Sequence, residues 1–224
     1  MQVFIAGGTG YMGRRLIGRL LERGHSITAL TRPGSENKLP AGCKAVTGNA
    51  LERCSYQDKI QPADTFVHLV GVAHPSPAKA AEFRAIDLVS AREAIAAAVA
   101  NQIQHFVYVS VAQPAPLMKA YVAVRAECES MLRQSGLNAT VVRPWYVLGP
   151  GHRWPYALIP FYWVLERLPP TRDGARRLGL VTLDQMISSL VSAVENPCRG
   201  VRIVTVPEMK TGISTDSSAQ ATAL

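Results

Sequence analysis

The sequence feature that most constrains the fold lies at the start of the chain, where a strand-like run leads directly into a cluster of glycines. Residues 2–6 (Gln-Val-Phe-Ile-Ala) include β-branched and aromatic side chains, and residues 7–13 read Gly-Gly-Thr-Gly-Tyr-Met-Gly. Apolar residues then recur at helical spacing, at Met12, Leu16, Ile17, Leu20 and Leu21. Gly24 is placed to end this helix, and residues 26–30 form the next strand-like run. The pattern predicts a βαβ unit.

The rest of the chain continues the alternation of strands and helices. Further strand-like runs lie at residues 65–70, 105–110, 139–142 and 201–206. Helices are predicted for residues 78–101, 121–134 and 183–195, the first of them rich in alanine. This order predicts an α/β fold, a Rossmann-type doubly wound parallel sheet with helices on both faces and a small C-terminal extension on the substrate side.

The domain organisation follows from the same pattern. We expect residues 1–210 to form a single dinucleotide-binding domain, with residues 145–180 as a small lid on the substrate side. Residues 211–224 show no periodicity, and we expect a disordered tail there.

Size and charge narrow the class of protein. A chain of 224 residues is ample for one domain with a buried core. The 24 Lys and Arg outnumber the 16 Asp and Glu, and the resulting net charge of +8 favours anionic partners. The basic residues are scattered and no nucleic-acid-binding motif accompanies them, so we expect no nucleic-acid partner. A phosphorylated cofactor or an acidic substrate explains the charge.

The spacing of the cysteines and the lengths of the apolar runs indicate the cellular compartment that we expect for this protein. The four cysteines, Cys43, Cys54, Cys128 and Cys198, form no CxxC pair, so we expect neither a metal site nor a disulfide framework. The chain starts without a signal-peptide pattern, and no run of about 20 residues is suited to cross a bilayer. We therefore expect a cytoplasmic protein without a transmembrane segment. A peripheral membrane contact through residues 154–168 stays an alternative, and the oligomeric state stays open.

The glycine cluster is typical of a dinucleotide site. Gly8, Gly10 and Gly13 match G-x-G-x-x-G between a predicted strand and a predicted helix. The missing side chains let the backbone approach a pyrophosphate, whose charge then meets the helix N-terminus. We expect the whole loop to bind the cofactor, namely Gly7, Gly8, Thr9, Gly10, Tyr11, Met12 and Gly13. The alternative is a turn that serves only strand–helix packing.

The end of the second predicted strand bears on the choice of cofactor. An NAD site would place an acidic residue there, against the adenosine ribose. This chain has Arg32 instead, with no acid until Glu36. A guanidinium would bind the 2′-phosphate of NADP, so NADP is preferred to NAD. The alternative is an exposed loop arginine.

Three further segments carry a family resemblance. They are residues 66–71 (Phe-Val-His-Leu-Val-Gly), 105–110 (His-Phe-Val-Tyr-Val-Ser) and 143–151 (Arg-Pro-Trp-Tyr-Val-Leu-Gly-Pro-Gly). With the glycine cluster, they resemble the extended and atypical branch of the short-chain dehydrogenase/reductase superfamily, which includes NAD(P)-dependent epimerase/dehydratases and NmrA-like proteins. The resemblance implies cofactor contacts at Leu69, Val70, Gly71, Asn49 and Pro144. The Asn49 amide could bind the adenine or only shape its turn.

The resemblance also implies a catalytic set. Active members of the superfamily use a serine after the fifth strand and a Tyr-x-x-x-Lys pair, and the matching residues here are Ser110, Tyr121 and Arg125. The four-residue spacing puts Tyr121 and Arg125 on one helix face. Arginine replaces the lysine that holds the nicotinamide ribose. Arg125 could still bind this ribose through its N–H groups, and a cation beside a phenol still favours the phenolate form. Catalysis and dinucleotide binding without turnover both stay open.

The expected substrate region follows the last catalytic segments. Residues 145–170 hold seven of the fifteen aromatic residues: Trp145, Tyr146, Trp154, Tyr156, Phe161, Tyr162 and Trp163. Basic residues gather nearby: Arg143, His152, Arg153, Arg167, Arg172, Arg176 and Arg177. We therefore expect a small substrate of apolar or anionic character. The resulting hypothesis is an NADP-dependent oxidoreductase acting on a carbonyl or alcohol, with two alternatives: an epimerase or dehydratase, and a non-catalytic NADP(H)-binding regulatory or assembly protein.

Overall fold

The computed structural model describes residues 1–150 and 172–212. Its main sheet contains the strands β1 (Gln2–Ala6), β2 (Ser26–Thr31), β3 (Lys44–Thr47), β4 (Thr65–His68), β5 (His105–Val109), β6 (Ala139–Val142) and β9 (Val201–Val204). The seven strands run in the order β3-β2-β1-β4-β5-β6-β9, and every neighbouring pair is parallel. The predicted doubly wound parallel sheet is confirmed.

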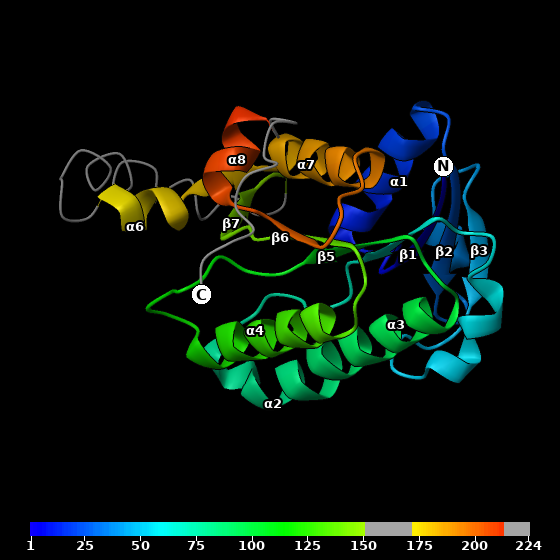
Figure 1. Cartoon of the computed structure of the whole chain (residues 1–224), viewed down its shortest axis with the longest axis horizontal. Coiled ribbons are helices and arrows are strands. Elements are labelled where there is room, and N and C mark those ends of the chain that lie inside the picture. Colours follow the sequence, from blue (N-terminus) through cyan, green and yellow to red (C-terminus); the bar gives the residue numbers. More distant parts are fainter. Residues whose placement is uncertain (151–171, 213–224) are drawn as a thin grey trace.

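Helices cover both faces of this sheet (Figure 1). One face carries α1 (Tyr11–Glu22), α7 (Leu183–Glu195) and α8 (Val206–Thr211), and the other carries α2 (Ala80–Glu82), α3 (Val89–Ala100) and α4 (Lys119–Gln134). A separate pair of parallel strands, β7 (Tyr146–Leu148) and β8 (Leu180–Thr182), lies near α6 (Arg172–Arg177). Short 3-10 turns occupy Glu36–Lys38, Arg53–Ser55, Gln57–Lys59 and Pro77–Lys79.

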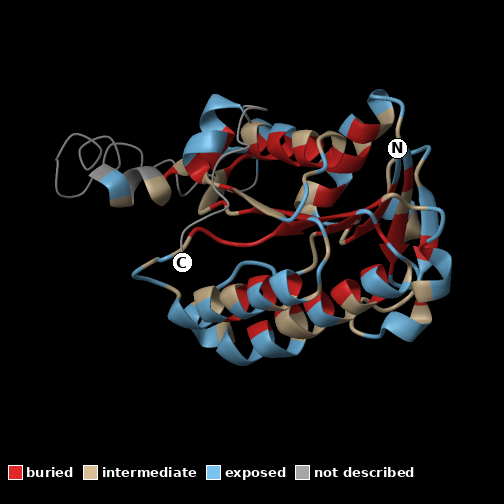
Figure 2. Ribbon diagram, in the orientation of Figure 1, coloured by how far each residue is buried: buried red, intermediate tan, exposed pale blue. Residues whose placement is uncertain are grey.

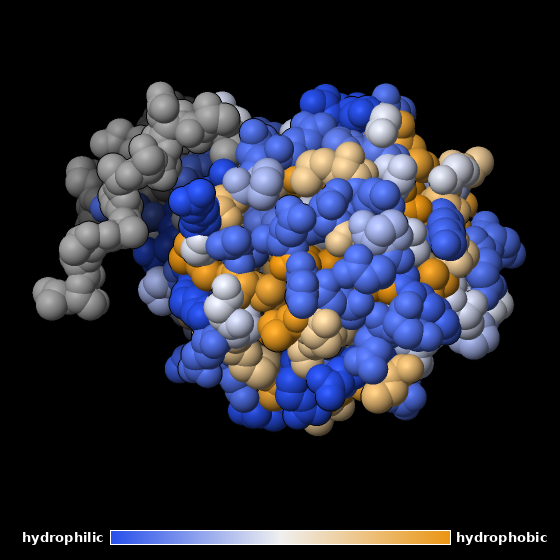
Figure 3. All heavy atoms as spheres, turned by 45° about the vertical axis from the view of Figure 1, so that its right-hand side comes forward, coloured by the Kyte–Doolittle hydropathy of each residue, from blue (hydrophilic) through white to orange (hydrophobic). Residues whose placement is uncertain are grey.

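The strands bury side chains on both faces, which is why they read as nearly continuous apolar runs. In β1, Val3 and Ile5 belong to the core under α1 and α7, whereas Phe4 and Ala6 belong to the core under α3 and α4. Figure 2 shows burial concentrated in the sheet and on the inner sides of the helices. The face shown in Figure 3 is largely hydrophilic with scattered apolar residues, as on ordinary protein surfaces.

The first helix ends as the sequence predicts. Gly24 adopts φ +79°, its N–H donates to the carbonyl of Leu21, and the N–H of His25 donates to that of Leu20. This pair of bonds is a Schellman motif, for which glycine is preferred because a Cβ strains the left-handed conformation.

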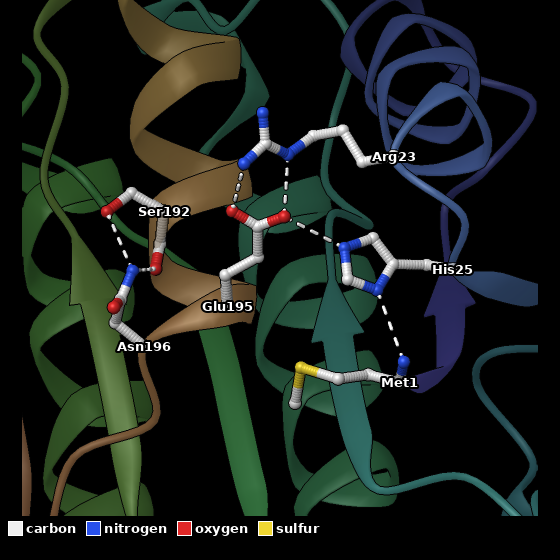
Figure 4. A network of polar contacts seen from close by, with 6 residues as sticks. All are labelled: Met1, Arg23, His25, Ser192, Glu195 and Asn196. Carbon is white, nitrogen blue, oxygen red and sulfur yellow. Dashed lines mark hydrogen bonds and ion pairs between the residues drawn. The ribbon is translucent and has the colours of Figure 1, made fainter.

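Just beyond this point the end of α1 is fixed to α7 (Figure 4). Arg23 donates to both carboxylate oxygens of Glu195, with Nε–Oε1 and Nη2–Oε2 distances of 2.6 and 2.8 Å. The His25 ring nitrogen Nε2 lies 2.9 Å from Oε1 of the same carboxylate. The ion pair with Arg23 holds the pKa of Glu195 below its ordinary value.

The Ala-rich segment differs from the single regular helix predicted for residues 78–101. It contains a π-helical stretch, Phe83–Leu88, between α2 and α3. A π-turn adds one residue to the helix and changes the direction of the side chains that follow. Here the stretch contains the fully buried Asp87, whose carboxylate accepts hydrogen bonds from other parts of the chain. The strong helix propensity of alanine hides this local change in the sequence.

Other boundaries differ by a few residues. The predicted strand at residues 65–70 ends at His68, and the one at 201–206 ends at Val204 because Val206 begins α8. Strands β3, β7 and β8 are four residues or shorter, and sequence periodicity does not reveal them. Much of the predicted lid (residues 145–180) and nearly all of the predicted tail (residues 211–224) lie outside the described residues. Within the described ranges, no helix has the length and apolar character needed to cross a bilayer.

Candidate dinucleotide and active site

The glycine cluster forms a tight turn between β1 and α1. Gly7 has φ +92°, and its carbonyl accepts a hydrogen bond from the N–H of Gly10 at 3.1 Å. Gly10 is the N-terminal cap of α1, and its own carbonyl accepts from the N–H of Arg14. The turn therefore lies at the carboxyl edge of the parallel sheet, where ligands bind in folds of this kind.

The glycines of this turn have different reasons to lack a side chain. A Cβ on Gly7 would lie 2.9 Å from the backbone carbon of Leu69, and one on Gly13 would collide with the backbone of Gly7 and Gly8. Packing alone explains these positions. Gly10 is exposed, has an ordinary φ of −75°, and its Cβ would meet only the Gly7 carbonyl oxygen, at 3.2 Å. Close approach of a ligand explains a glycine there better than packing does.

The first turn of α1 is electrostatically suited to an anion. It contains no acidic residue, so the positive end of the helix dipole is not neutralised. Arg15 donates from Nη1 to the carbonyl of Tyr11 at 2.8 Å, and its guanidinium lies 4.2 Å from the centroid of the Tyr11 ring. The turn and its surroundings therefore fit the pyrophosphate of a dinucleotide.

The other residues expected to bind cofactor surround the same edge. Leu69 and Val70 contact the glycine turn, and the N–H of Leu69 donates to the carbonyl of Ala6 at 2.8 Å. Pro144 is buried, and its carbonyl accepts from the N–H of Ala112. The predicted contacts that follow β4 therefore lie beside the glycine turn.

Arg32 and Asn49 follow β2 and β3 at this edge. Arg32 is exposed in a turn closed by the N–H of Ser35. The Asn49 side-chain oxygen accepts from the N–H of Leu51 at 3.1 Å, so this residue shapes its turn. The N–H of the preceding Gly48 donates to Thr31, which joins the two loops.

Arg125 is the best-connected residue of the predicted catalytic set. Its side chain is 7% exposed and forms an ion pair with Asp87, with an Nη2–Oδ1 distance of 2.6 Å. Nη1 donates to the carbonyl of Val109 at 2.8 Å and to the Tyr108 hydroxyl at 3.2 Å. A Cβ on Gly71 would collide with this guanidinium, so the backbone of Gly71 lies directly on the ion pair.

Tyr121 lies beside the same guanidinium. The Arg125 Cζ atom is 5.2 Å from the centroid of the Tyr121 ring, within the range of a cation–π contact. The ring also packs on Phe83, at 5.0 Å between centroids. The predicted Tyr–Arg pair is therefore assembled, and α3's π-helical extension supplies contacts to both of its members.

Burial shifts the pKa values around Arg125. Burial raises the pKa of Asp87 above its ordinary value, and the hydrogen bonds from Arg125 and from the N–H of Val72 limit that rise. Burial likewise raises the pKa of Tyr108. His68, fully buried at the end of β4 and repelled by Arg125, has its pKa lowered to about 3 and stays neutral. The site is therefore a charge pair surrounded by neutral groups.

Ser110 is held by a second buried carboxylate. Its hydroxyl donates to Glu129 Oε1 at 2.6 Å, and Gln113 Nε2 donates to the same oxygen at 2.7 Å. Arg143 donates to both oxygens, and Arg133 donates to Oε2 at 3.0 Å. Burial opposes ionisation of Glu129, but these donors outweigh it and lower its pKa. Through Val109, the residue before Ser110, the same loop also contacts Arg125.

Sequence reasoning missed Asp87 and Glu129, which hold the predicted residues in place. A signal existed for each. Asp87 is the one acidic residue between Glu82 and Glu93, and Glu129 continues the four-residue spacing of Tyr121 and Arg125. The partners of both lie far away in the chain, so spacing alone cannot identify them.

Some predicted site residues cannot be placed. The aromatic residues Trp154, Tyr156, Phe161, Tyr162 and Trp163 and the basic residues His152, Arg153 and Arg167 lie outside the described residues, as do the side chains of Arg172 and Arg176. Across residues 1–150 and 172–212, no group of three or more His, Cys, Asp or Glu could hold a metal ion.

The sheet order and the glycine turn define a Rossmann-type dinucleotide-binding protein. The chain belongs to the NAD(P)H-binding family, whose profile matches residues 7–153. The predicted resemblance to the short-chain dehydrogenase/reductase superfamily is confirmed.

Three relatives illustrate the range of this family. The chain is 28% identical to a 4-hydroxy-2-methyl-3-oxo-4-farnesyl-3,4-dihydroquinoline-1-oxide ketoreductase of Stigmatella aurantiaca, over 66% of this chain and 51% of that protein. It is 27% identical to a 3-diazoavenalumate denitrifying reductase of a Streptomyces species, over 93% and 77%. It is 25% identical to the photosystem II assembly factor Ycf39 of Cyanophora paradoxa, over 64% and 44%. The chain thus spans about half the length of the first of these relatives.

A solved structure shows the same fold. The Bordetella bronchiseptica enzyme WbmH, determined in complex with NAD+, superposes with a TM-score of 0.67 at 22% identity, covering 92% of this chain and 78% of WbmH.

Proposed function

We propose that this protein is an NADP-dependent oxidoreductase of the short-chain dehydrogenase/reductase type, acting on a small carbonyl or alcohol substrate. The observation that carries the proposal is the buried Arg125 guanidinium beside the ring of Tyr121, 5.2 Å from its centroid. The pair matches the tyrosine and cation that active members of the superfamily use for proton transfer. The ketoreductase and the denitrifying reductase among the relatives support the same class of reaction.

The turn at Gly7 to Gly13 would hold the pyrophosphate of the cofactor, and Leu69 to Gly71 would lie along its nicotinamide half. A Cβ at Gly10 would enter the space that the pyrophosphate requires. The lack of a side chain at this position therefore supports the assignment. When bound, NADP supplies hydride transfer to or from the substrate carbon.

The chain itself supplies the proton. In reduction Tyr121 gives its phenolic proton to the carbonyl oxygen, and in oxidation it takes a proton from the alcohol. Arg125 acts through Tyr121, because Nη1 and Nη2 already donate to Asp87, Tyr108 and Val109. The hydroxyl proton of Ser110 points to Glu129, so its oxygen is placed to accept from the O–H of an alcohol substrate. To polarise a carbonyl, Ser110 would have to turn this proton from Glu129 to the substrate oxygen.

The preference for NADP rests on Arg32. It is exposed directly after β2, and the strand neighbouring β1 carries the ribose-binding residue in this fold. A guanidinium there gains charge-assisted hydrogen bonds to a 2′-phosphate that NAD lacks.

Calorimetric titration with NADPH and NADH tests the site and the preference. We expect NADPH to bind more tightly, and Arg32→Ala to weaken NADPH binding about tenfold or more, toward the NADH level. Arg19→Ala, which removes an exposed arginine two turns into α1, is the matched control and should change nothing. If neither dinucleotide binds, or if Arg32→Ala is silent, the assignment fails.

A second candidate function is dinucleotide binding without turnover, in a regulatory or assembly role. The favouring observation is that Ser110 and Arg125 are each already bonded to a buried carboxylate. The assembly factor among the relatives supports this alternative. Binding of NADPH without reduction of any carbonyl in a broad panel would favour it.

A further inference from the structure

We propose that a cavity beside α4 is the subsite for the anionic group of the substrate, which we infer to be a carboxylate or phosphate monoester carried on an apolar chain. The inference rests on the proposed function, because the cavity adjoins the helix that carries Tyr121. It deepens that function by naming the chemical class of the substrate.

The cavity is a hollow of about 460 Å³ that is widely open to solvent, and it lies where three segments of the substrate side meet. These segments are the loop between β5 and α4, the first turns of α4 and the residue after β6. The lining residues are Gln113, Pro114, Ala115, Lys119, Val122, Ala123 and Arg143. Such a volume suits a small organic ligand, since ligand pockets span about 300–1,000 Å³. Lys119, Val122 and Ala123 lie on a different face of α4 from Tyr121 and Arg125. The cavity is linked to the predicted catalytic set through Glu129, to which Gln113 and Arg143 of the lining and Ser110 all donate.

Three cations from separate elements lie at this cavity. Lys119 is exposed at the start of α4, and nothing in the described part of the chain forms a hydrogen bond or ion pair with it. Arg143 is part of the lining and its side chain is 17% exposed. Arg177, from α6, reaches the cavity wall by donating from Nε to the carbonyl of Pro114 at 3.2 Å.

Glu129 does not neutralise this charge. Its carboxylate is 1% exposed, so it lies behind the cavity and not in it. It accepts from Arg143 at 2.5 and 2.9 Å and from Arg133 at 3.0 Å, so one negative charge is shared by two guanidinium groups. Lys119 and Arg177 have no acidic partner in the described residues, and the net local charge is positive. An anionic group entering the cavity therefore gains attraction that a neutral group does not.

Apart from Gln113, whose Nε2 donates to Glu129, the remaining wall is apolar. Pro114, Ala115, Val122 and Ala123 contribute no charged group and offer methyl, methylene and ring carbons. A ligand that meets both requirements carries an anion at one end and an apolar chain beside it. The charged residues would orient the ligand, and the apolar wall would supply contact area. Small-ligand sites commonly combine these two features.

Three probes of equal chain length test this subsite: octanoate, octyl phosphate and the uncharged octanamide. Binding to the full chain is measured by calorimetry without dinucleotide. The variants are Lys119→Gln and Arg177→Gln, and Lys44→Gln on β3, at the opposite edge of the sheet, is the matched control. We expect at least one of the two anions to bind about tenfold more tightly than octanamide, and each cavity variant to weaken it about threefold or more. The stronger of the two anions identifies the headgroup.

Three results would overturn the inference. Octanamide could bind as well as both anions, neither cavity variant could weaken binding, or NADPH could displace the anion while Lys119→Gln leaves it unaffected. The last result would place the anion at the N-terminus of α1. Because the assay needs no turnover, anion binding that responds to Lys119→Gln in a protein that reduces no carbonyl would refute only the proposed function, not the subsite.

Discussion

Arg125 and Asp87 form a buried ion pair, with 2.6 Å between Nη2 and Oδ1, although they are 38 residues apart in the chain. The pair joins α4 to the π-helical stretch before α3 and lies under the backbone of Gly71. A lysine at position 125 would be shorter in reach and would lack the fork that contacts Asp87, Tyr108 and Val109 together. Arg125 therefore has a structural role, as the partner of Asp87, that a lysine could not fill in the same way.

The first prediction concerns this pair. Arg125→Met leaves the Asp87 carboxylate buried without its cation, and we expect a loss of about 3–5 kcal/mol in the free energy of unfolding. The double variant Arg125→Met/Asp87→Asn should recover part of that loss, because the uncompensated charge is gone. Urea unfolding of the three proteins gives the coupling energy. Arg133→Met is the control, since Glu129 keeps Arg143, and an equal loss in both arginine variants would contradict the prediction.

The second prediction concerns the proton donor. Tyr121→Phe should lower kcat for carbonyl reduction about 100-fold or more, because the phenol supplies the proton. The ring still packs on Phe83 and Arg125, so NADPH affinity and unfolding midpoint should stay within error of the wild type. Tyr146→Phe, outside the Arg125 cluster, serves as the control. Unchanged turnover in Tyr121→Phe would remove Tyr121 from the mechanism.

The third prediction separates folding from binding within the glycine turn. Gly13→Ala places a methyl group on the backbone of Gly7 and Gly8, so we expect a large loss of stability, about 3 kcal/mol or more. Gly10→Ala keeps an allowed φ of −75° and meets one carbonyl at 3.2 Å, so its melting temperature should change little. Its affinity for NADPH should still fall about tenfold or more. A Gly10→Ala protein that binds normally would indicate a turn that serves packing alone.

The fourth prediction concerns pH. Burial lowers the pKa of His68 to about 3, against an ordinary value of 6.5, so the folded state disfavours the protonated ring. The unfolded chain then binds more protons between these values. The contribution of His68 to stability is therefore fully present above pH 6.5 and is lost as the pH drops toward 3. Unfolding at pH 5 and pH 7 should show this loss, and His68→Phe should reduce the slope. His74→Phe, in an exposed loop, should keep it, and equal slopes in all three proteins would refute the assignment.

Much of the fold could be predicted from local signals. The glycine cluster, Gly24 and the apolar spacing of residues 12–21 together specify the first βαβ unit, because each signal acts within a few residues. The π-helical stretch could not be predicted, because the alanine-rich sequence around it favours a regular helix and the partner of Asp87 lies on another helix. The same holds for β3, in which one residue, Val46, is buried.

The candidate site likewise has features that the sequence predicts and features that it does not. The spacing of Tyr121 and Arg125 on one helix face is visible in the sequence, and the structure brings them together. The direction of the Ser110 hydroxyl is not visible, because it depends on Glu129, whose own orientation depends on Arg143 after another strand. Long-range contacts with carboxylates determine which of the predicted catalytic groups remain available to a substrate. A short sequence motif cannot predict such contacts.

The carboxylate of Glu129 has a mechanical consequence. It receives hydrogen bonds from the loop after β5, from α4 and from the end of β6, so these three segments share one anchor. A ligand that displaces any one of these segments must also change the bonds that Glu129 makes to the others. We therefore expect this wall to resist local adjustment, and random substitutions that broaden substrate range should spare positions 110, 129 and 143.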